Sequence, residues 1–204
     1  MTRIVCRMIS VFALAAFLAE AGQAQTRTAE PETVRIRKLN GLAGRSVVTT
    51  PIYASNVGRS ARPPREWLEV QVVYDTAPAW LDELVVEYFV MMMDRVDGNN
   101  VYSLFKLTVR YLDVERERNH LGVSYLRPSA LKRYGRVVAV AVEISHDGKV
   151  AATETDASIK LPPVWWRNPA VTENKELTVR DGYLVNKADS PFAFVNPDDY
   201  EVIK

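Results

Sequence analysis

The segment from Leu84 to Met93 constrains the fold most strongly, because it is apolar at almost every position. As a strand it would carry apolar side chains on both faces, with Glu87 as its one charge. Strands of this kind are usually central in a sheet and covered on both sides. A helix is the alternative, since Pro78 suits a first helical turn and apolar residues recur at helical spacings. The β-branched and aromatic run from Val85 to Val90 favours the strand.

The N-terminal segment has the composition of a signal peptide. Two arginines precede an apolar stretch from Met8 to Ala19, which is short for a membrane span. Small-residue tripeptides ending at Ala21 and Ala24 both offer a cleavage site. We therefore expect residues 1–24 to be removed and the mature chain to be exported to the periplasm or the outer cell surface. An uncleaved membrane anchor is the alternative; no later stretch predicts a membrane span.

Cleavage would leave a chain without cysteine and without net charge. Cys6, the one cysteine of the 204 residues, lies in the signal peptide, so neither a disulfide nor a thiol nucleophile is expected. The full chain has 26 basic and 25 acidic residues, and loss of Arg3, Arg7 and Glu20 leaves 24 of each. This balance gives no reason to expect nucleic acid or an acidic membrane as the main partner.

The remaining chain predicts an all-β fold. Residues 25–45 are expected to form a lead-in with a possible edge strand, and residues 46–204 the folded domain. Asp147-Gly148 predicts a tight hairpin, and residues 177–185 predict another. Pro128–Gly135 predicts a short helix, with Pro in its first turn and Gly at its end. Eight to ten short strands with frequent turns indicate an immunoglobulin-like antiparallel β-sandwich with one short helix.

The chain offers little catalytic chemistry. Its two histidines, His120 and His146, are isolated among charged or turn residues, so we expect them to be surface or satisfied side chains. The sequence contains none of the common motifs for zinc peptidases, thiol redox enzymes, nucleophile elbows or phosphate-binding loops. Residues 94–100 lack the ligand spacing of a calcium loop. We expect a protein that is not an enzyme and uses neither a cofactor nor a metal.

Aromatic and basic residues are the better candidates for binding. Trp165 and Trp166 lie beside prolines, where an exposed ring could stack on a sugar or enter a partner's pocket. We favour the alternative, in which both rings close the open end of the core. We also expect Trp80, just ahead of the central strand, to be a core residue. Residues 54–65 form a basic loop, which is either a polar surface or a contact for an anion or a partner through Arg59, Arg62 and Arg65.

Several short segments resemble a small family of exported proteins from verrucomicrobial bacteria, including mucin-degrading gut members. The resemblance extends from Trp67 to the C-terminus, and its segments are Trp67–Val70, Trp80–Leu84, Leu126–Pro128, Arg133–Gly135, Trp165–Trp166 and Ser190–Ala193. Members have an immunoglobulin-like sandwich, and their genes lie beside type IV pilus assembly genes. The resemblance implies a role in the cell envelope or in pilus assembly, and it brings no catalytic residues.

These observations support two main hypotheses. The first is a non-enzymatic exported module that binds another envelope or pilus-assembly protein, with an exposed edge strand as one possible contact. The second is a carbohydrate-binding module that uses Trp165 or Trp166. A secreted hydrolase of unrecognised type is a third, and it would need convergent polar residues in a deep cleft.

Overall fold

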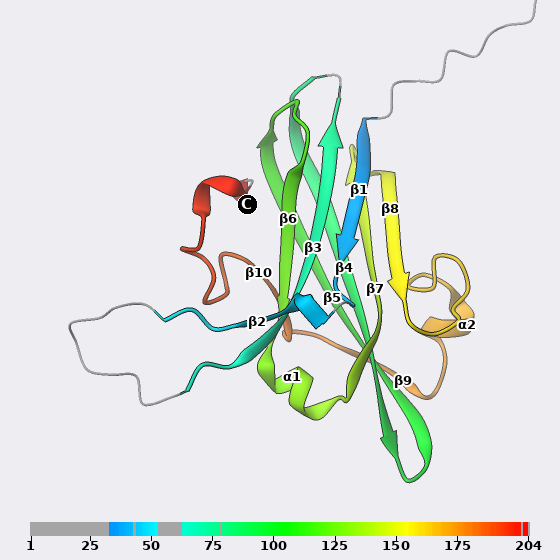
Figure 1. Cartoon of the computed structure of the whole chain (residues 1–204). Helices are drawn as coiled ribbons and strands as arrows, with labels where there is room; N and C mark the ends of the chain where they lie inside the picture. The colour runs from blue at the N-terminus through cyan, green and yellow to red at the C-terminus, as the bar shows by residue number, and fades with distance from the viewer. Residues whose placement is uncertain (1–32, 43, 53–62, 78, 201, 204) are drawn as a thin grey trace, which may run out of the picture. The chain divides into compact units, whose positions relative to one another are not determined.

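Strand β4 (Leu81–Val96) contains the doubly apolar segment and lies in the middle of the larger of two sheets (Figure 1). The computed structural model describes residues 33–42, 44–52, 63–77, 79–200 and 202–203, all within the compact unit Pro31–Lys204. The predicted signal peptide and the start of the predicted lead-in lie outside the described residues. The strand prediction for Leu84–Met93 is confirmed, and the helical alternative is wrong.

The larger sheet, sheet B, has six strands within the described residues. Their order is β11-β5-β4-β7-β8, and β9 pairs with β5. All pairings in sheet B are antiparallel except the parallel one between β5 and β9. The strands that join β4 are β5 (Asn99–Val114), β7 (Arg136–His146), β8 (Lys149–Ala157), β9 (Leu177–Arg180) and β11 (Val202–Ile203).

The smaller sheet, sheet A, has five strands among the described residues, in the order β1-β3-β6-β10 with β2 also paired to β3. All of these pairings are antiparallel. The strand β1 forms one edge, in agreement with the predicted edge strand. The strands are β1 (Val34–Asn40), β2 (Val47–Thr49), β3 (Glu66–Thr76), β6 (His120–Leu126) and β10 (Leu184–Asn186).

The two sheets confirm the predicted all-β sandwich. The predicted helix is also present as α1 (Pro128–Arg133), and a second helix of one turn, α2 (Pro169–Thr172), was not expected. The 3₁₀ turns η1 (Gly44–Ser46) and η2 (Pro197–Asp199) complete the helical elements of the described residues. The expectation of short strands is wrong for β4 and β5, which have 16 residues each. Their apolar pattern continues into polar ends that stay paired.

Both faces of β4 are buried, as the sequence predicted. One face packs between the sheets, and its side chains are fully buried: Leu84, Val86, Tyr88, Val90 and Met92. The opposite face carries Phe89 and Met91, which pack under Trp165 and Trp166. Full burial of one such side chain contributes about 1.5–3 kcal/mol. The segment that contains Trp165 and Trp166 covers the outer face of sheet B and therefore contributes to the stability of the fold.

Two Asp-Gly turns form hairpins with left-handed backbone at both central residues. Asp147 and Gly148 have φ values of 50° and 72° and join β7 to β8. Asp97 and Gly98 have φ values of 51° and 85° and join β4 to β5. Positive φ at both positions matches the twist of the flanking strands. The hairpin predicted at Asp147-Gly148 is confirmed.

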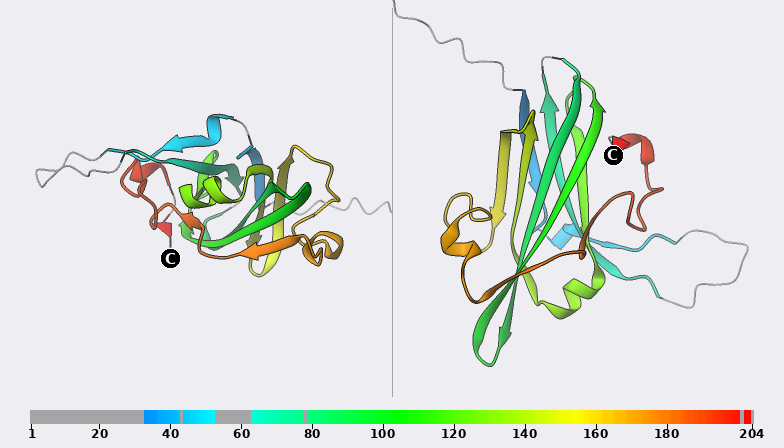
Figure 2. Two further views of the ribbon diagram at one scale, coloured as in Figure 1. Left: turned by 90° about the horizontal axis from the view of Figure 1, so that it is seen from below. Right: turned by 180° about the vertical axis from the view of Figure 1, so that it is seen from behind.

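The hairpin predicted for residues 177–185 is wrong. The strand β9 pairs with β5 in sheet B, whereas β10 pairs with β6 in sheet A. The turn between them does contain Gly182 with a φ of 78°. However, the chain crosses there from one sheet to the other (Figure 2). A local turn signal fixes where a chain bends, and it does not fix which strands its two arms join.

Candidate functional site

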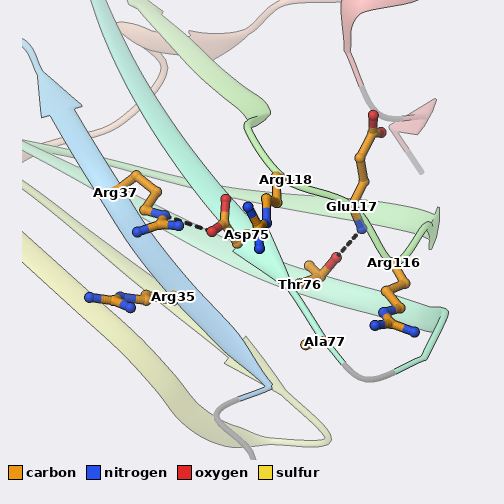
Figure 3. A pocket seen from close by; sticks show the side chains of 8 residues that line it. All are labelled: Arg35, Arg37, Asp75, Thr76, Ala77, Arg116, Glu117 and Arg118. Carbon is orange, nitrogen blue, oxygen red and sulfur yellow. Dashed lines mark hydrogen bonds and ion pairs between the residues drawn. The ribbon is translucent and has the colours of Figure 1, made fainter.

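An arginine-rich cleft lies at the end of sheet A where β1 begins and β3 ends (Figure 3). Its volume is about 520 Å³, which is within the range of small-molecule and peptide-side-chain sites. Three segments form its walls: β1, the end of β3, and the loop between β5 and β6. The lining residues are Arg35, Arg37, Asp75, Thr76, Ala77, Arg116, Glu117 and Arg118. We call it the arginine cleft.

A β-bulge in β1 places its charges on the outside. Ile36 is opposite Tyr74 and Lys38 is opposite Val73, so Arg37 is the extra residue of the bulge. The bulge is needed because alternation in the sequence breaks at Arg37-Lys38. With one residue taken up, both of these charged side chains stay exposed and Leu39 still packs against the core. Arg35 and Arg37 therefore both face the cleft.

Hydrogen bonds to Thr76 and Asp75 hold the β5–β6 loop in place. The Thr76 N–H donates to Glu117 O at 3.0 Å, and its hydroxyl donates to Glu115 O at 2.5 Å. The Glu117 N–H in turn donates to the Thr76 hydroxyl at 3.1 Å. The Asn119 N–H donates to Asp75 Oδ1 at 3.0 Å. This wall of the cleft is therefore fixed by β3 rather than by the loop alone.

Charge in the arginine cleft is only partly balanced. Arg37 Nε lies 2.6 Å from Asp75 Oδ2, with 42% and 15% of the two side chains exposed. Burial acts to raise the pKa of the Asp75 carboxyl, but the Asn119 N–H, Arg37 and the charge of Arg118 hold that pKa below its ordinary value. Within the described residues, Arg35 and Arg116 have no carboxylate partner. The cleft thus keeps a positive surplus that suits an anionic ligand.

Trp80 is at the same end of the sandwich and is exposed. The strand β4 starts at Leu81, which pairs with Val114 just before the β5–β6 loop. Trp80 directly precedes this pair, and 60% of its surface is accessible. The prediction that Trp80 belongs to the core is wrong. It lies just before the paired part of β4, which begins at Leu81.

Trp165 and Trp166 do not form a binding surface. They are 1% and 4% exposed and pack at right angles to each other on the outer face of sheet B. The Trp165 indole N–H donates to the hydroxyl of Thr155 at 2.9 Å. The stacking surface predicted for a sugar is therefore wrong, because neither ring has an open face. The alternative of a core role is correct in kind, but the rings cover the face of a sheet rather than the end of the core.

Arg167, the next residue, joins two carboxylates that face each other across β4 and β7. Glu87 and Glu143 are direct partners in the strand register, and like charges in this position repel each other. Arg167 Nη2 lies 2.5 Å from Glu87 Oε2 and 2.6 Å from Glu143 Oε1, and Arg167 Nε also donates to Glu143. The Trp166 indole N–H adds a bond of 3.1 Å to Glu143 Oε2. We call this group the Arg167 clasp.

Of the predicted basic contacts, the structure describes only Arg65. Its side chain is exposed, and its backbone is tied to Thr50 by hydrogen bonds of 2.9 to 3.2 Å. Arg59 and Arg62 lie outside the described residues. Arg65 does not line the arginine cleft.

Both histidines have hydrogen-bonding contacts, as expected. His120 is 5% exposed, stacks on Tyr74 and has its Nε2 2.9 Å from the Thr76 hydroxyl. His146 has its Nδ1 3.3 Å from Glu83 O. In the described part of the chain, no group of three or more His, Cys, Asp or Glu could hold a metal ion. None of the helices described there is long and apolar enough to cross a membrane.

Sequence reasoning missed both the arginine cleft and the Arg167 clasp. Each had a visible signal: Arg35/Arg37 and Arg116/Arg118 are alternating arginines, and Glu87 and Glu143 are single charges within apolar strands. By local pattern alone, the alternating arginines indicate only exposed charges on an edge strand and in a loop. Their meeting depends on the pairing of β1 with β3 and on the β5–β6 connection, which no local pattern specifies.

Two comparisons with known proteins bear on the fold and the family. A family model matches residues 26–204. A crystal structure of a protein from the verrucomicrobe Akkermansia muciniphila matches with a TM-score of 0.69 at 21% identity, over 84% of this chain and 93% of that one. No curated protein matches. At this identity the structural likeness establishes the fold alone, and the association with pilus genes stays a prediction.

Proposed function

This chain belongs to the family whose model matches residues 26–204, and from that premise we propose that it is an exported, non-enzymatic protein-interaction module of the cell envelope. Its partner is another envelope protein, and we propose a component of type IV pilus assembly. The sequence resemblance to exported verrucomicrobial proteins and the signal-peptide composition of residues 1–24 support the compartment and the partner class.

The observation that carries the proposal is the arginine cleft. It joins a preformed hollow of about 520 Å³ to a positive surplus on a rigid sandwich. Positive surfaces of this kind raise association rates with acidic partners and select against basic ones. The exposed indole of Trp80 lies at the same end of the sandwich, and exposed tryptophans are frequent anchors in protein interfaces.

Site-specific crosslinking in the native organism tests this proposal. A photo-crosslinking amino acid would replace Ala77 in the cleft or, as the control, Lys106, which is exposed on the outer face of sheet B. We expect an adduct with an envelope protein from position 77 and none from position 106. Adducts in cytoplasmic fractions, or equal adducts from both positions, would contradict the proposal. N-terminal sequencing of the mature protein would test cleavage after Ala21 or Ala24.

A further inference from the structure

We propose that the arginine cleft binds an extended acidic segment of the partner protein, with carboxylates at alternate residues. This inference rests on the proposed function and specifies the chemistry of its binding site.

The arginines line two facing walls of the cleft. Arg35 and Arg37 come from β1, with Arg37 in the bulge, and Arg116 and Arg118 come from the β5–β6 loop. Alternate side chains of an extended peptide point to the same side, about 6.6 Å apart along its axis. Carboxylates at alternate residues of such a peptide can therefore all face the arginines. A guanidinium binds a carboxylate with two parallel hydrogen bonds, which makes this match directional.

The arrangement is less suited to a compact anion. Figure 3 shows Arg35 and Arg37 on one side of the cleft and Arg116 on the other, with Asp75 and Arg118 between them. A single phosphate is best bound where guanidinium groups converge on one point, and these groups are spread over both sides of the cleft. A neutral sugar chain would gain little from this lining, because six of its eight residues are charged. A linear polyanion of peptide type fits the spread arginines best.

Asp75 sets how much of the site is available. Its carboxylate occupies Arg37 at 2.6 Å and also accepts the Asn119 N–H. A ligand carboxylate must share Arg37 with Asp75, while Arg35 and Arg116 have no such competitor among the described residues. Replacement of Asp75 by Asn keeps an oxygen for the Asn119 N–H and removes the negative charge. Asp75→Asn is therefore expected to tighten binding, whereas loss of Arg35 or Arg116 is expected to weaken it.

The test uses the mature protein and three synthetic octapeptides, of which the first two have the same composition. In the first, Glu alternates with Thr; in the second, four Glu precede four Thr; in the third, Gln replaces every Glu of the first. A heparin hexasaccharide is the fourth probe. Affinity is measured by calorimetry at two salt concentrations. Protection of Trp80 from iodide quenching is a second readout, because Trp67, Trp165 and Trp166 are all at most 6% exposed.

We expect the alternating peptide to bind best and to protect Trp80. Arg35→Gln and Arg116→Gln should each weaken it about three- to tenfold, and Asp75→Asn should tighten it by a similar factor. Arg95→Gln, beside the turn at the other end of β4, is the control and should leave affinity unchanged. Tighter binding of the block peptide or of heparin, or no effect of the cleft variants, would overturn the inference.

The iodide readout needs no variant, so the inference stays testable even if one substitution perturbs folding. It also separates this inference from the proposed function. A crosslinked envelope partner at Ala77 together with no binding of any acidic peptide would overturn the inference and leave the proposed function standing. Peptide binding without any envelope partner would support the chemistry of the cleft and contradict the envelope role.

Discussion

The Arg167 clasp and the arginine cleft both pair arginine with carboxylate, and they differ in how charge is balanced. In the clasp, one guanidinium serves Glu87 and Glu143, and the latter is only 3% exposed. In the cleft, four arginines meet two acidic side chains, and Arg37 pairs with Asp75 at 2.6 Å. A buried charge has to be compensated within the fold. Exposed cations are solvated by water, so a surplus is tolerated and remains available to a partner.

The tryptophans repeat this contrast. Trp165 is 1% exposed and donates its N–H within the fold, whereas Trp80 is 60% exposed at the end that holds the cleft. Side chains with satisfied contacts on the outer face of sheet B serve stability. Side chains with unused surface near the cleft are the candidates for recognition. If this division is right, substitutions on the covered face should destabilise the protein far more than substitutions near the cleft.

Trp165→Ala should be the most destabilising change. It removes a large buried ring and leaves the Thr155 hydroxyl without its indole partner. We expect the free energy of unfolding to fall by about 3–5 kcal/mol. Chemical denaturation measures the change, and Trp80→Ala is the matched control, with an expected change below about 0.5 kcal/mol. Equal effects at the two positions would break the division between covered and exposed tryptophans.

Arg167→Ala should have the next largest effect, because it leaves Glu87 and Glu143 opposite each other without a cation. We expect a loss of about 2–3 kcal/mol, below the range for a fully buried pair because 51% of the Arg167 side chain is exposed. A second change, Glu143→Gln, should recover part of the loss. Arg110→Ala is the control, since its exposed pair with Glu83 should be worth under about 1 kcal/mol. A similar effect of both arginine changes would refute a special role for the clasp.

Acid should weaken the clasp. The hydrogen bonds from Arg167, opposed by burial and aided by Trp166, hold the pKa of Glu143 below its ordinary value of 4.5. Because the folded pKa is the lower one, the stabilisation is complete above about pH 4.5 and is lost as the pH falls through the folded pKa. Urea denaturation from pH 7 to pH 3 should show a smaller loss for Glu143→Gln than for the unchanged protein. Parallel pH curves for the two proteins would contradict this assignment.

The sequence predicted the parts of the fold that depend on local pattern. Residues 84–93 are apolar in both alternating sets, and Asp147-Gly148 has the chemistry of a tight turn, so strand, burial and hairpin all follow from neighbouring residues. The failures arise where the outcome depends on distant residues. The two arms around Gly182 join different sheets, and Trp80 is exposed because it lies just before the paired and buried start of β4.

The candidate site could not be predicted from the sequence, because it too depends on distant residues. Arg35 and Arg116 are 81 positions apart in the sequence (116 minus 35). They line one cleft because β1 pairs with β3, and because the β5–β6 loop is hydrogen-bonded to Thr76. Glu87 and Glu143 become partners only in the register of β4 and β7. A single charge inside an apolar strand nevertheless predicts a counter-charge in the fold, so the sequence does indicate that Glu87 and Glu143 need a cationic partner.

Removal of cleft arginines should affect stability least. The double variant Arg35→Gln with Arg116→Gln deletes two exposed cations that have no carboxylate partner among the described residues. We expect the free energy of unfolding to change by no more than about 0.5 kcal/mol, and at low salt the variant should be slightly the more stable because repulsion among the arginines is reduced. Thermal denaturation at low and high salt measures both effects. If the free energy of unfolding fell as much as it does in Arg167→Ala, these arginines would be stabilising the fold. The contrast between the Arg167 clasp and the arginine cleft would then be wrong.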